Sequence, residues 1–210
     1  MIDLYTWSTP NGQKVSIMLE EIAMPYTVHP IDITNHEQFD DNFLKISPNN
    51  KIPAIVDHDN GMAMMESGAI LLYLADKSGR FMPCNEAARW RTMQWLMFQM
   101  GGLGPMLGQA HHFLRFNKGV SDYASRRYSI EAQRLYDVME QQLENHEYLA
   151  GEYSVADIAS WPWIARFEWQ GINLNEYPNV KRWYLAIAAR PAVQRGYSVP
   201  DGQKEIPLPG

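Results

Sequence analysis

The 210-residue sequence contains a single cysteine, Cys84, and this scarcity limits its redox chemistry. One thiol cannot form an internal disulfide or a C-x-x-C redox pair. Cys84 lies in the loop-forming run FMPCN, with no adjacent basic side chain that would stabilise a thiolate. We therefore interpret Cys84 as incidental.

The sequence also lacks a long apolar run and a basic stripe. No stretch approaches the ~20 apolar residues that a membrane-spanning helix needs. No signal peptide is expected at residues 1–4, because no basic segment is followed by a long apolar one. Neither half carries the basic patch and stacking aromatics of a nucleic-acid module. These absences predict a cytoplasmic protein without a membrane or nucleic-acid partner.

The composition, 46% hydrophobic and 20% charged, is typical of a globular protein with a sizeable core. Residues 1–77 carry four basic and eleven acidic side chains, whereas residues 78–210 carry fourteen and thirteen. Six of the seven tryptophans follow residue 77. We predict a first domain over 1–77, a linker over 78–85, a second domain over 86–196 and an extended tail over 197–210.

Strand and helix patterns alternate in the first domain. Residues 2–5 alternate like a strand, and apolar residues then recur at helical spacing over 15–22. A second strand is predicted over 26–33 and a short helix over 38–45, before two short strands and a helix that starts near Ser67. The order βαβ, α, ββα predicts an α+β domain of the thioredoxin-like type.

The second domain has helical periodicity throughout. Long apolar-periodic runs cover 86–116 and 123–144, and a final helix is predicted over 180–189, where Arg190-Pro191 stops it. Ser154 and Asp157 are spaced like a capping box at the start of a further helix. The pattern predicts an all-α domain.

Two features of the segment 47–68 fit a small zwitterionic ligand. Pro53 opens a strand and donates no hydrogen bond, so the backbone of Ile52 stays available to an extended ligand, and a cis Ile52-Pro53 bond would hold that edge. Ser67 stands where a helix N-cap is expected, and Glu66 beside it can accept from an ammonium. Each feature alone is more typical of ordinary structure, but the pair favours a site for an α-amino-acid group.

The chain resembles the cytosolic glutathione transferases, and within them the nu class of glutathione-dependent disulfide-bond oxidoreductases. The motifs that carry the resemblance are TPNG at 9–12, ISPNNKIPAIVDH at 46–58, ESGAILLYL at 66–74, GGLGPMLGQ at 101–109 and the segment 153–163. They span roughly the first 190 residues. The resemblance implies glutathione as co-substrate and a homodimer.

By this resemblance, the γ-glutamyl group of glutathione is expected at Glu66 and Ser67. The cysteinyl backbone is expected to pair with Ile52 beside a cis Pro53. Both expectations agree with the chemistry of the residues themselves.

The resemblance also places the glycyl carboxylate near Lys51 and Gln38. Lys51 is a local counter-charge for an anionic tripeptide in an acidic domain. An arginine of the partner subunit can reach the ligand in this class, and Arg127 is our candidate. A solvated helix charge is the alternative interpretation of Arg127.

The residue that activates the sulfur is expected at the junction of the first strand and first helix. By resemblance, the Thr9 hydroxyl and Asn11, through its amide or backbone N–H, are expected to donate to the thiolate. Ser8 could supplement or replace Thr9. Tyr5 lies inside the strand and is a weaker candidate.

These residues predict a glutathione-dependent thiol–disulfide reductase that acts on small or mixed disulfides without a protein cysteine. Conjugation of glutathione to small electrophiles, with reduction of organic hydroperoxides, is one alternative, and a non-catalytic glutathione-binding regulatory protein is another. No metal is expected, since the adjacent His111 and His112 cannot share a helix face and no other cluster has ligand spacing.

Overall fold

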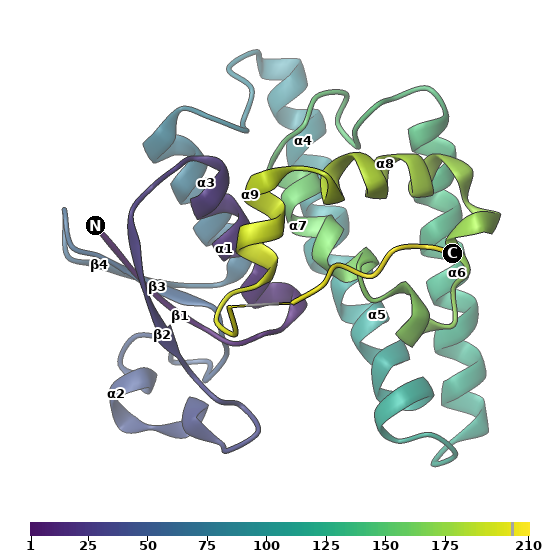
Figure 1. The fold of residues 1–210 in the computed structure, drawn as a ribbon, viewed down its shortest axis with the longest axis horizontal. Coiled ribbons are helices and arrows are strands. Elements are labelled where there is room, and N and C mark those ends of the chain that lie inside the picture. Colours follow the sequence, from purple (N-terminus) through teal and green to yellow (C-terminus); the bar gives the residue numbers. More distant parts are fainter. Residues whose placement is uncertain (203) are drawn as a thin grey trace. The chain divides into compact units, whose positions relative to one another are not determined.

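The computed structural model describes residues 1–202 and 204–210, which form two compact units (Figure 1). The first unit comprises Met1–Met82 and Ala189–Ile206, and the second comprises Pro83–Ala188 and Pro207–Gly210. The first unit thus joins an N-terminal and a C-terminal segment of the chain, and the predicted domain bounds stay a prediction.

The first unit contains a four-stranded mixed sheet. Its strands are β1 (Ile2–Thr6), β2 (Tyr26–Pro30), β3 (Ala54–Asp57) and β4 (Met62–Met65), in the order β2-β1-β3-β4. β1 pairs parallel with β2 and antiparallel with β3, which pairs antiparallel with β4. The predicted thioredoxin-like arrangement is confirmed, and the third and fourth strands form the expected hairpin.

Helices cover both faces of this sheet. α1 (Pro10–Glu21) and α3 (Ser67–Ser78) lie on one face and α2 (Asp41–Leu44) on the other, as Figure 1 shows. A 3₁₀ turn over Glu37–Phe39 precedes α2, so the predicted helix over 38–45 is divided in two. The apolar side chains buried beneath α1 and α3 include Leu4, Val15, Met18, Leu19, Ile55, Ile70, Leu71 and Leu74.

The first unit also contains a helix that the sequence reading missed. α8 (Pro178–Ala188) corresponds to the predicted final helix, but α9 (Pro191–Tyr197) follows it. Arg190-Pro191 ends one helix and starts the next, because a proline at the first helical position loses no hydrogen bond. The hydroxyl of Ser16 donates to the Gly196 carbonyl at 2.7 Å, which ties α9 to α1.

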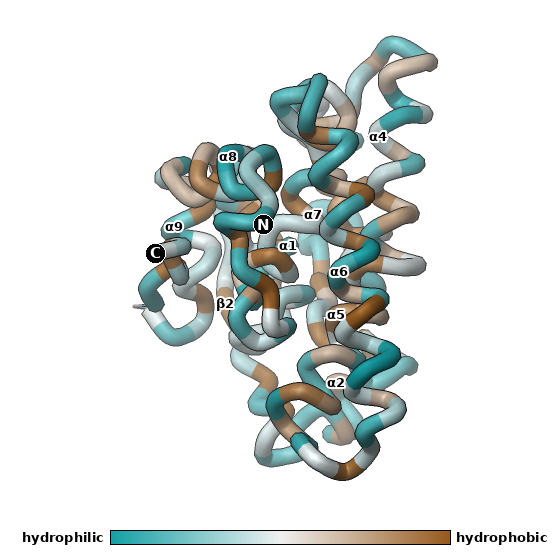
Figure 2. Tube along the Cα trace, turned by 90° about the vertical axis from the view of Figure 1, so that its right-hand side faces the viewer, coloured by the Kyte–Doolittle hydropathy of each residue, from teal (hydrophilic) through white to brown (hydrophobic). Residues whose placement is uncertain are grey.

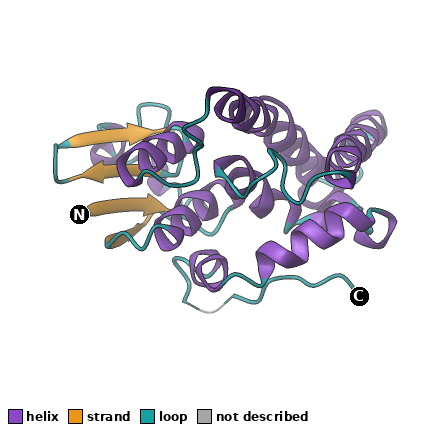
Figure 3. Ribbon diagram, turned by 90° about the horizontal axis from the view of Figure 1, so that it is seen from above, coloured by secondary structure: helices purple, strands orange, loops and turns teal. Residues whose placement is uncertain are grey.

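All regular elements of the second unit are helical (Figure 3). They are α4 (Glu86–Phe98), α5 (Gly104–His111), α6 (Asp122–Glu144), α7 (Val155–Ile164) and α8, with π-helical turns at Gln99–Leu103 and His112–Phe116 and 3₁₀ turns at Phe167–Gln170 and Leu174–Glu176. The tube of Figure 2 changes repeatedly between hydrophilic and hydrophobic colours along these helices, as amphipathic packing requires. The predicted all-α domain is confirmed.

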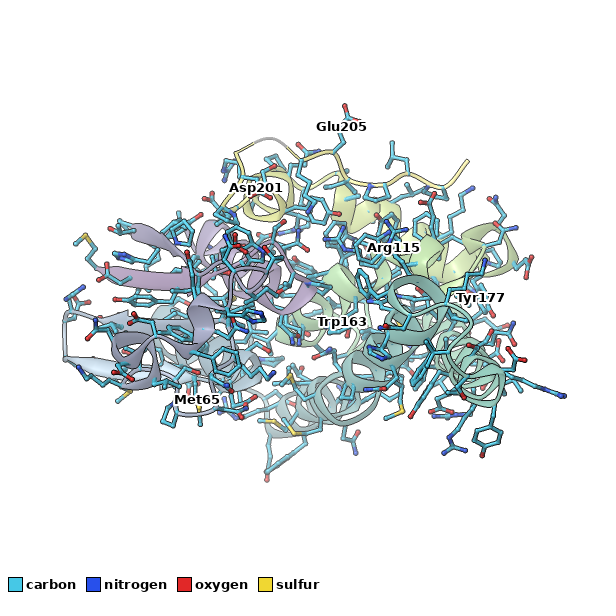
Figure 4. The ribbon with its side chains drawn as sticks, turned by 90° about the horizontal axis from the view of Figure 1, so that it is seen from below. Met65, Arg115, Trp163, Tyr177, Asp201 and Glu205 are labelled. Atoms are coloured by element: carbon cyan, nitrogen blue, oxygen red, sulfur yellow. The ribbon has the colours of Figure 1, made fainter. Side chains whose placement is uncertain are left out.

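Asp157 organises the start of α7. It forms the predicted capping box with Ser154, and its Oδ1 also accepts from the indole N–H of Trp183 at 2.8 Å. Trp161 and Trp163 are buried, and Figure 4 labels Trp163 among the side chains of this unit. In the described part of the chain, no helix is long and apolar enough to cross a membrane.

Candidate functional site

The Thr9 hydroxyl at the start of α1 already accepts a hydrogen bond. Thr9 is the N-cap residue, and its Oγ1 accepts a hydrogen bond from the backbone N–H of Gly12 at 3.2 Å. A hydroxyl that accepts in this way keeps its own proton for another partner. The positive end of the α1 helix dipole lies at the same place. Both the hydroxyl proton and the dipole therefore stabilise an anion near Thr9.

Gly12 lets the helix start lie against the end of β1. A Cβ at this position would lie 2.3 Å from the Trp7 carbonyl oxygen and 2.4 Å from Thr6 Oγ1, closer than any side chain tolerates. The Thr-Pro-Asn-Gly motif therefore combines a cap, a proline at the first helical position and a close backbone approach. Asn11, the second residue of α1, lies at this junction as predicted.

The two alternative side chains at this junction make other contacts. Ser8 Oγ accepts from Lys204 Nζ at 2.6 Å, a contact with the C-terminal segment that the sequence did not suggest. The Tyr5 ring stacks on His29 with centroids 4.7 Å apart. Burial, together with the charge of Asp3, raises the pKa of Tyr5, so its phenol stays protonated at neutral pH.

The segment before β3 has the predicted backbone form. The Ile52–Pro53 peptide bond is cis, and β3 begins at the next residue. The hydroxyl of Ser47 donates to the Lys51 carbonyl at 2.8 Å and fixes the preceding loop. Lys51 itself is exposed, as a counter-charge for a ligand must be.

The start of α3 differs in one detail from the prediction. Ser67 is the first residue of α3, and Glu66 occupies the N-cap position without a side-chain capping bond. The predicted N-cap role of Ser67 is therefore wrong, because the backbone turns into the helix one residue earlier. Glu66 has φ 69° and ψ 110°, a conformation that costs free energy for a residue with a side chain and that clusters at functional sites.

The strand register brings these segments together. Tyr5 of β1 pairs with Ala54 of β3, and Ala54 pairs with Met65 of β4. These pairs place the end of β1 beside the start of β3 and the end of β4, along the edge of the sheet that is formed by strand ends. Thr9, Pro53 and Glu66 each lie within a few residues of this edge, which we call the ligand edge. Figure 4 labels Met65, the neighbour of Glu66.

Gln38 has a side-chain oxygen for which the described residues provide no hydrogen-bond donor. It lies in the 3₁₀ turn before α2, and its Oε1 is buried with no hydrogen-bond partner among the described residues. A buried acceptor without a donor costs free energy unless a ligand or water supplies one. A cavity of about 660 Å³ lies beside this turn, lined in part by Tyr5, His36, Phe39 and Phe43.

Arg127 belongs to the second unit. It is exposed on α6 and lines a cavity of about 510 Å³ with Tyr123, Arg126, Tyr128 and others. The hydrogen bond from Arg134 lowers the pKa of Glu131, and burial raises it by less. The positive charge of Arg127 makes a smaller contribution that also lowers this pKa. Its contact with glutathione stays a prediction.

Lys14 is the residue at the ligand edge that sequence reasoning missed. It is 1% exposed, and its Nζ donates to Ser67 Oγ at 3.3 Å, which links the first turns of α1 and α3. The sequence carries no signal for it, because a lysine on an amphipathic helix is ordinarily exposed to solvent.

Comparison with known proteins agrees with this geometry. The chain matches the family model for the N-terminal domain of glutathione S-transferases over residues 4–81 and that for the C-terminal domain over 126–191. It is 52% identical over 198 residues to the disulfide-bond oxidoreductase YfcG of Escherichia coli, covering 91% of this chain and 92% of the relative. The chain belongs to the glutathione transferase family.

Solved structures of this transferase's relatives show the same fold. A glutathione transferase from Pseudomonas putida, with one glutathione disulfide bound per subunit, is 43% identical with a TM-score of 0.91, covering 95% of this chain and 91% of the other. One from Burkholderia graminis, with two glutathione molecules bound per subunit, is 43% identical with a TM-score of 0.90, covering 96% and 89%. The predicted family and fold of this transferase are confirmed.

Proposed function

We propose that this glutathione transferase is a glutathione-dependent thiol–disulfide reductase that uses no cysteine of its own. The observation that supports it is the ligand edge, where a hydroxyl donor at a helix start, a cis-proline segment and a second helix start converge. The single cysteine, Cys84, is exposed in the loop before α4. We assign the reacting sulfur to glutathione.

Each part of glutathione has a chemical partner at or near this edge. The ammonium of the γ-glutamyl group meets Glu66, and its carboxylate meets Ser67 and the first N–H groups of α3. The cysteinyl backbone pairs with Ile52. The glycyl carboxylate lies near Lys51 and Gln38, while Arg127 from the second subunit of a homodimer completes the site. Relatives that were crystallised with glutathione support this assignment.

Thr9 and Asn11 hold the thiolate. A free thiol with a pKa near ~8.5 is only a few per cent ionised at neutral pH. A hydrogen bond to a charged group contributes roughly 1.5–3 kcal/mol, which corresponds to a pKa shift of about one to two. That shift ionises much of the bound thiol.

The reaction proceeds by two thiol–disulfide exchanges. The glutathione thiolate attacks one sulfur of the substrate disulfide, the S–S bond breaks, and the other sulfur leaves as a thiolate that takes up a proton. A second glutathione thiolate attacks the mixed disulfide and releases glutathione disulfide and the second substrate thiol. Two glutathione molecules are oxidised for each disulfide reduced. The cytoplasm, where glutathione is kept reduced, is the proposed location.

Conjugation of glutathione to an electrophile is the second candidate. The observation that favours it is that the solved relatives are described as glutathione transferases. It would use the same thiolate at Thr9 and differ only in the second substrate. Membership of the nu class, as opposed to another class of the family, is part of the first proposal.

Two assays on the purified full chain separate these functions. Turnover of hydroxyethyl disulfide with glutathione, coupled to a recycling reductase, is compared with conjugation of a halonitroarene. We expect the disulfide to turn over far faster. The opposite ranking would favour conjugation, and no turnover of either substrate with glutathione still bound would favour a regulatory protein.

A further inference from the structure

Lys14 is the charged side chain of the first unit that neither the fold nor the proposed reaction explains. It lies in the first turns of α1 within a run of eight buried residues, Gly12 to Leu19. Burial of an ammonium costs several kcal/mol unless charge and hydrogen bonds compensate it. A methionine of similar length would fill the same space without this cost.

Two of the polar groups near the Lys14 ammonium belong to the ligand edge. Ser67 Oγ is 3.3 Å from Lys14 Nζ and is itself only 4% exposed. Glu66 is near enough for its negative charge to raise the pKa of Lys14, against the larger effect of burial, which lowers it to about 7. Both residues are the ones assigned above to the γ-glutamyl group of glutathione.

The direction of the hydrogen bond has a chemical consequence. In its charged form Lys14 has three N–H donors and no acceptor, so Ser67 Oγ accepts from Lys14 Nζ. The single hydroxyl proton of Ser67 then points to a partner other than Lys14. The ammonium also places a positive charge behind a hydroxyl that itself stands at the positive end of α3. Both effects favour an anion in front of Ser67.

We propose that Lys14 is a positioning residue that prepares Ser67 to bind the α-carboxylate of the γ-glutamyl group. This inference rests on the proposed glutathione site and assigns a selectivity within it. Lys14 acts through Ser67, and its target is one charged group of the ligand rather than the tripeptide as a whole. Glu66 selects the ammonium of that same group, so the pair recognises a zwitterion.

The test compares three tripeptides that differ at one end. Glutathione carries both the ammonium and the α-carboxylate. 4-Aminobutanoyl-cysteinyl-glycine lacks only the carboxylate, and glutaryl-cysteinyl-glycine lacks only the ammonium. Calorimetric affinities of the three are measured for the wild-type chain and for Lys14→Met, which removes the charge and keeps the length.

The expected result is selective. Lys14→Met lowers the affinity for glutathione and for the glutaryl peptide at least tenfold, while the affinity for the 4-aminobutanoyl peptide changes less than twofold. A change in packing would weaken all three ligands alike, so equal losses would overturn the proposal. Unchanged affinity for all three would overturn it as well.

A double-mutant cycle gives an independent readout that does not need the analogues. If Lys14 acts through Ser67, the double variant Lys14→Met, Ser67→Ala binds glutathione no more weakly than Ser67→Ala alone. Additive losses would contradict this route. Lys45→Met, which removes an exposed lysine of the same unit, is the matched control and leaves all affinities unchanged.

The outcomes separate this inference from the proposed function. Failure of the wild-type chain to bind glutathione would reject the glutathione site itself. Tight binding by the wild type with a non-selective effect of Lys14→Met would reject only the role of Lys14. If Lys14→Met does not fold, the same three ligands are measured with Ser67→Ala and with Lys14→Gln, which keeps an N–H donor without the charge. Binding of glutathione by Lys14→Gln with wild-type affinity would overturn the proposed need for the charge.

Discussion

The Thr9 hydroxyl accepts from the backbone N–H of Gly12 at 3.2 Å, so its own proton is directed away from the helix that it caps. One side chain thereby serves two purposes. As an N-cap it stabilises α1, and as a donor it presents a proton at the positive end of that helix. The site and the fold depend on the same residue.

Replacing Thr9 by alanine tests this double role. We expect the pKa of bound glutathione to rise by roughly one unit, about 1.4 kcal/mol, with the rate at neutral pH lowered, affinity nearly unchanged and the rate recovering as pH increases. The lost cap also costs about 1 kcal/mol of unfolding free energy. Ultraviolet titration of the bound thiolate and urea unfolding measure the two effects.

Two control variants show whether the donor is Thr9. Thr9→Ser keeps the hydroxyl and should keep both the titration and the cap. Ser8→Ala should leave the thiolate pKa in place, because Thr9 and not Ser8 is the N-cap residue at the positive end of α1. A titration that moves with Ser8→Ala and not with Thr9→Ala would make this a serine-type transferase.

Cys84→Ser should keep nearly all disulfide reductase activity. Cys84 is exposed in the loop before α4, and the proposed reaction uses only glutathione and substrate sulfurs. The coupled hydroxyethyl disulfide assay measures this. Loss of activity by a variant that still folds and binds glutathione would contradict the cysteine-free mechanism.

Gly196→Ala should destabilise the first unit, because there is no space for a methyl group between α9 and α1. A Cβ at this position would lie 2.5 Å from Ile17 Cα and 2.6 Å from Ile17 N, which are backbone atoms that cannot move aside. Overpacking of this kind costs about 1–3 kcal/mol. Chemical unfolding measures the loss. Gly101→Ala, where the added Cβ has no neighbour within 4 Å, is the matched control and should not destabilise the chain.

The decrease in the free energy of unfolding at acid pH should depend on the contact between Asp57 and Lys77. Burial raises the pKa of Asp57, but hydrogen bonds from Lys77 and Tyr73 outweigh it and lower the pKa to about 2, from 3.8. The folded state then binds fewer protons than the unfolded state between those values. The stabilisation, roughly 1–2 kcal/mol, is complete above pH 4 and is lost as the pH falls towards 2.

Lys77→Met tests this assignment. Without the ammonium 2.5 Å from Asp57 Oδ2, the variant should be less stable at pH 7, and its stability should fall less steeply between pH 4 and pH 2. Urea unfolding at several pH values measures both. An unchanged slope in that window would show that Lys77 does not set the pKa of Asp57.

The amino-acid sequence by itself determined the local elements of this protein. Apolar spacing at period 3.6 over residues 15–22 and 123–144 specified amphipathic helices, and Ser154 with Asp157 specified the start of α7, because capping needs only residues three apart. The cis Pro53 segment also follows from a local motif, whereas the roles of residues 9–11 are implied by the family resemblance and stay a prediction. The local elements are short-range properties that neighbouring residues fix together.

Only the tertiary structure decided which distant groups meet. The pairing of Tyr5 with Ala54 and of Ala54 with Met65 creates the ligand edge, and nothing in the sequence of one strand states its partner's register. The same holds for Lys14 against Ser67, since a lysine on an amphipathic helix is ordinarily solvated and only packing of α1 on α3 buries this one. Helix α9 was missed because Pro191 reads as a stop as readily as a start, and its place on α1 depends on contacts some 180 residues apart, such as that of Ser16 with Gly196.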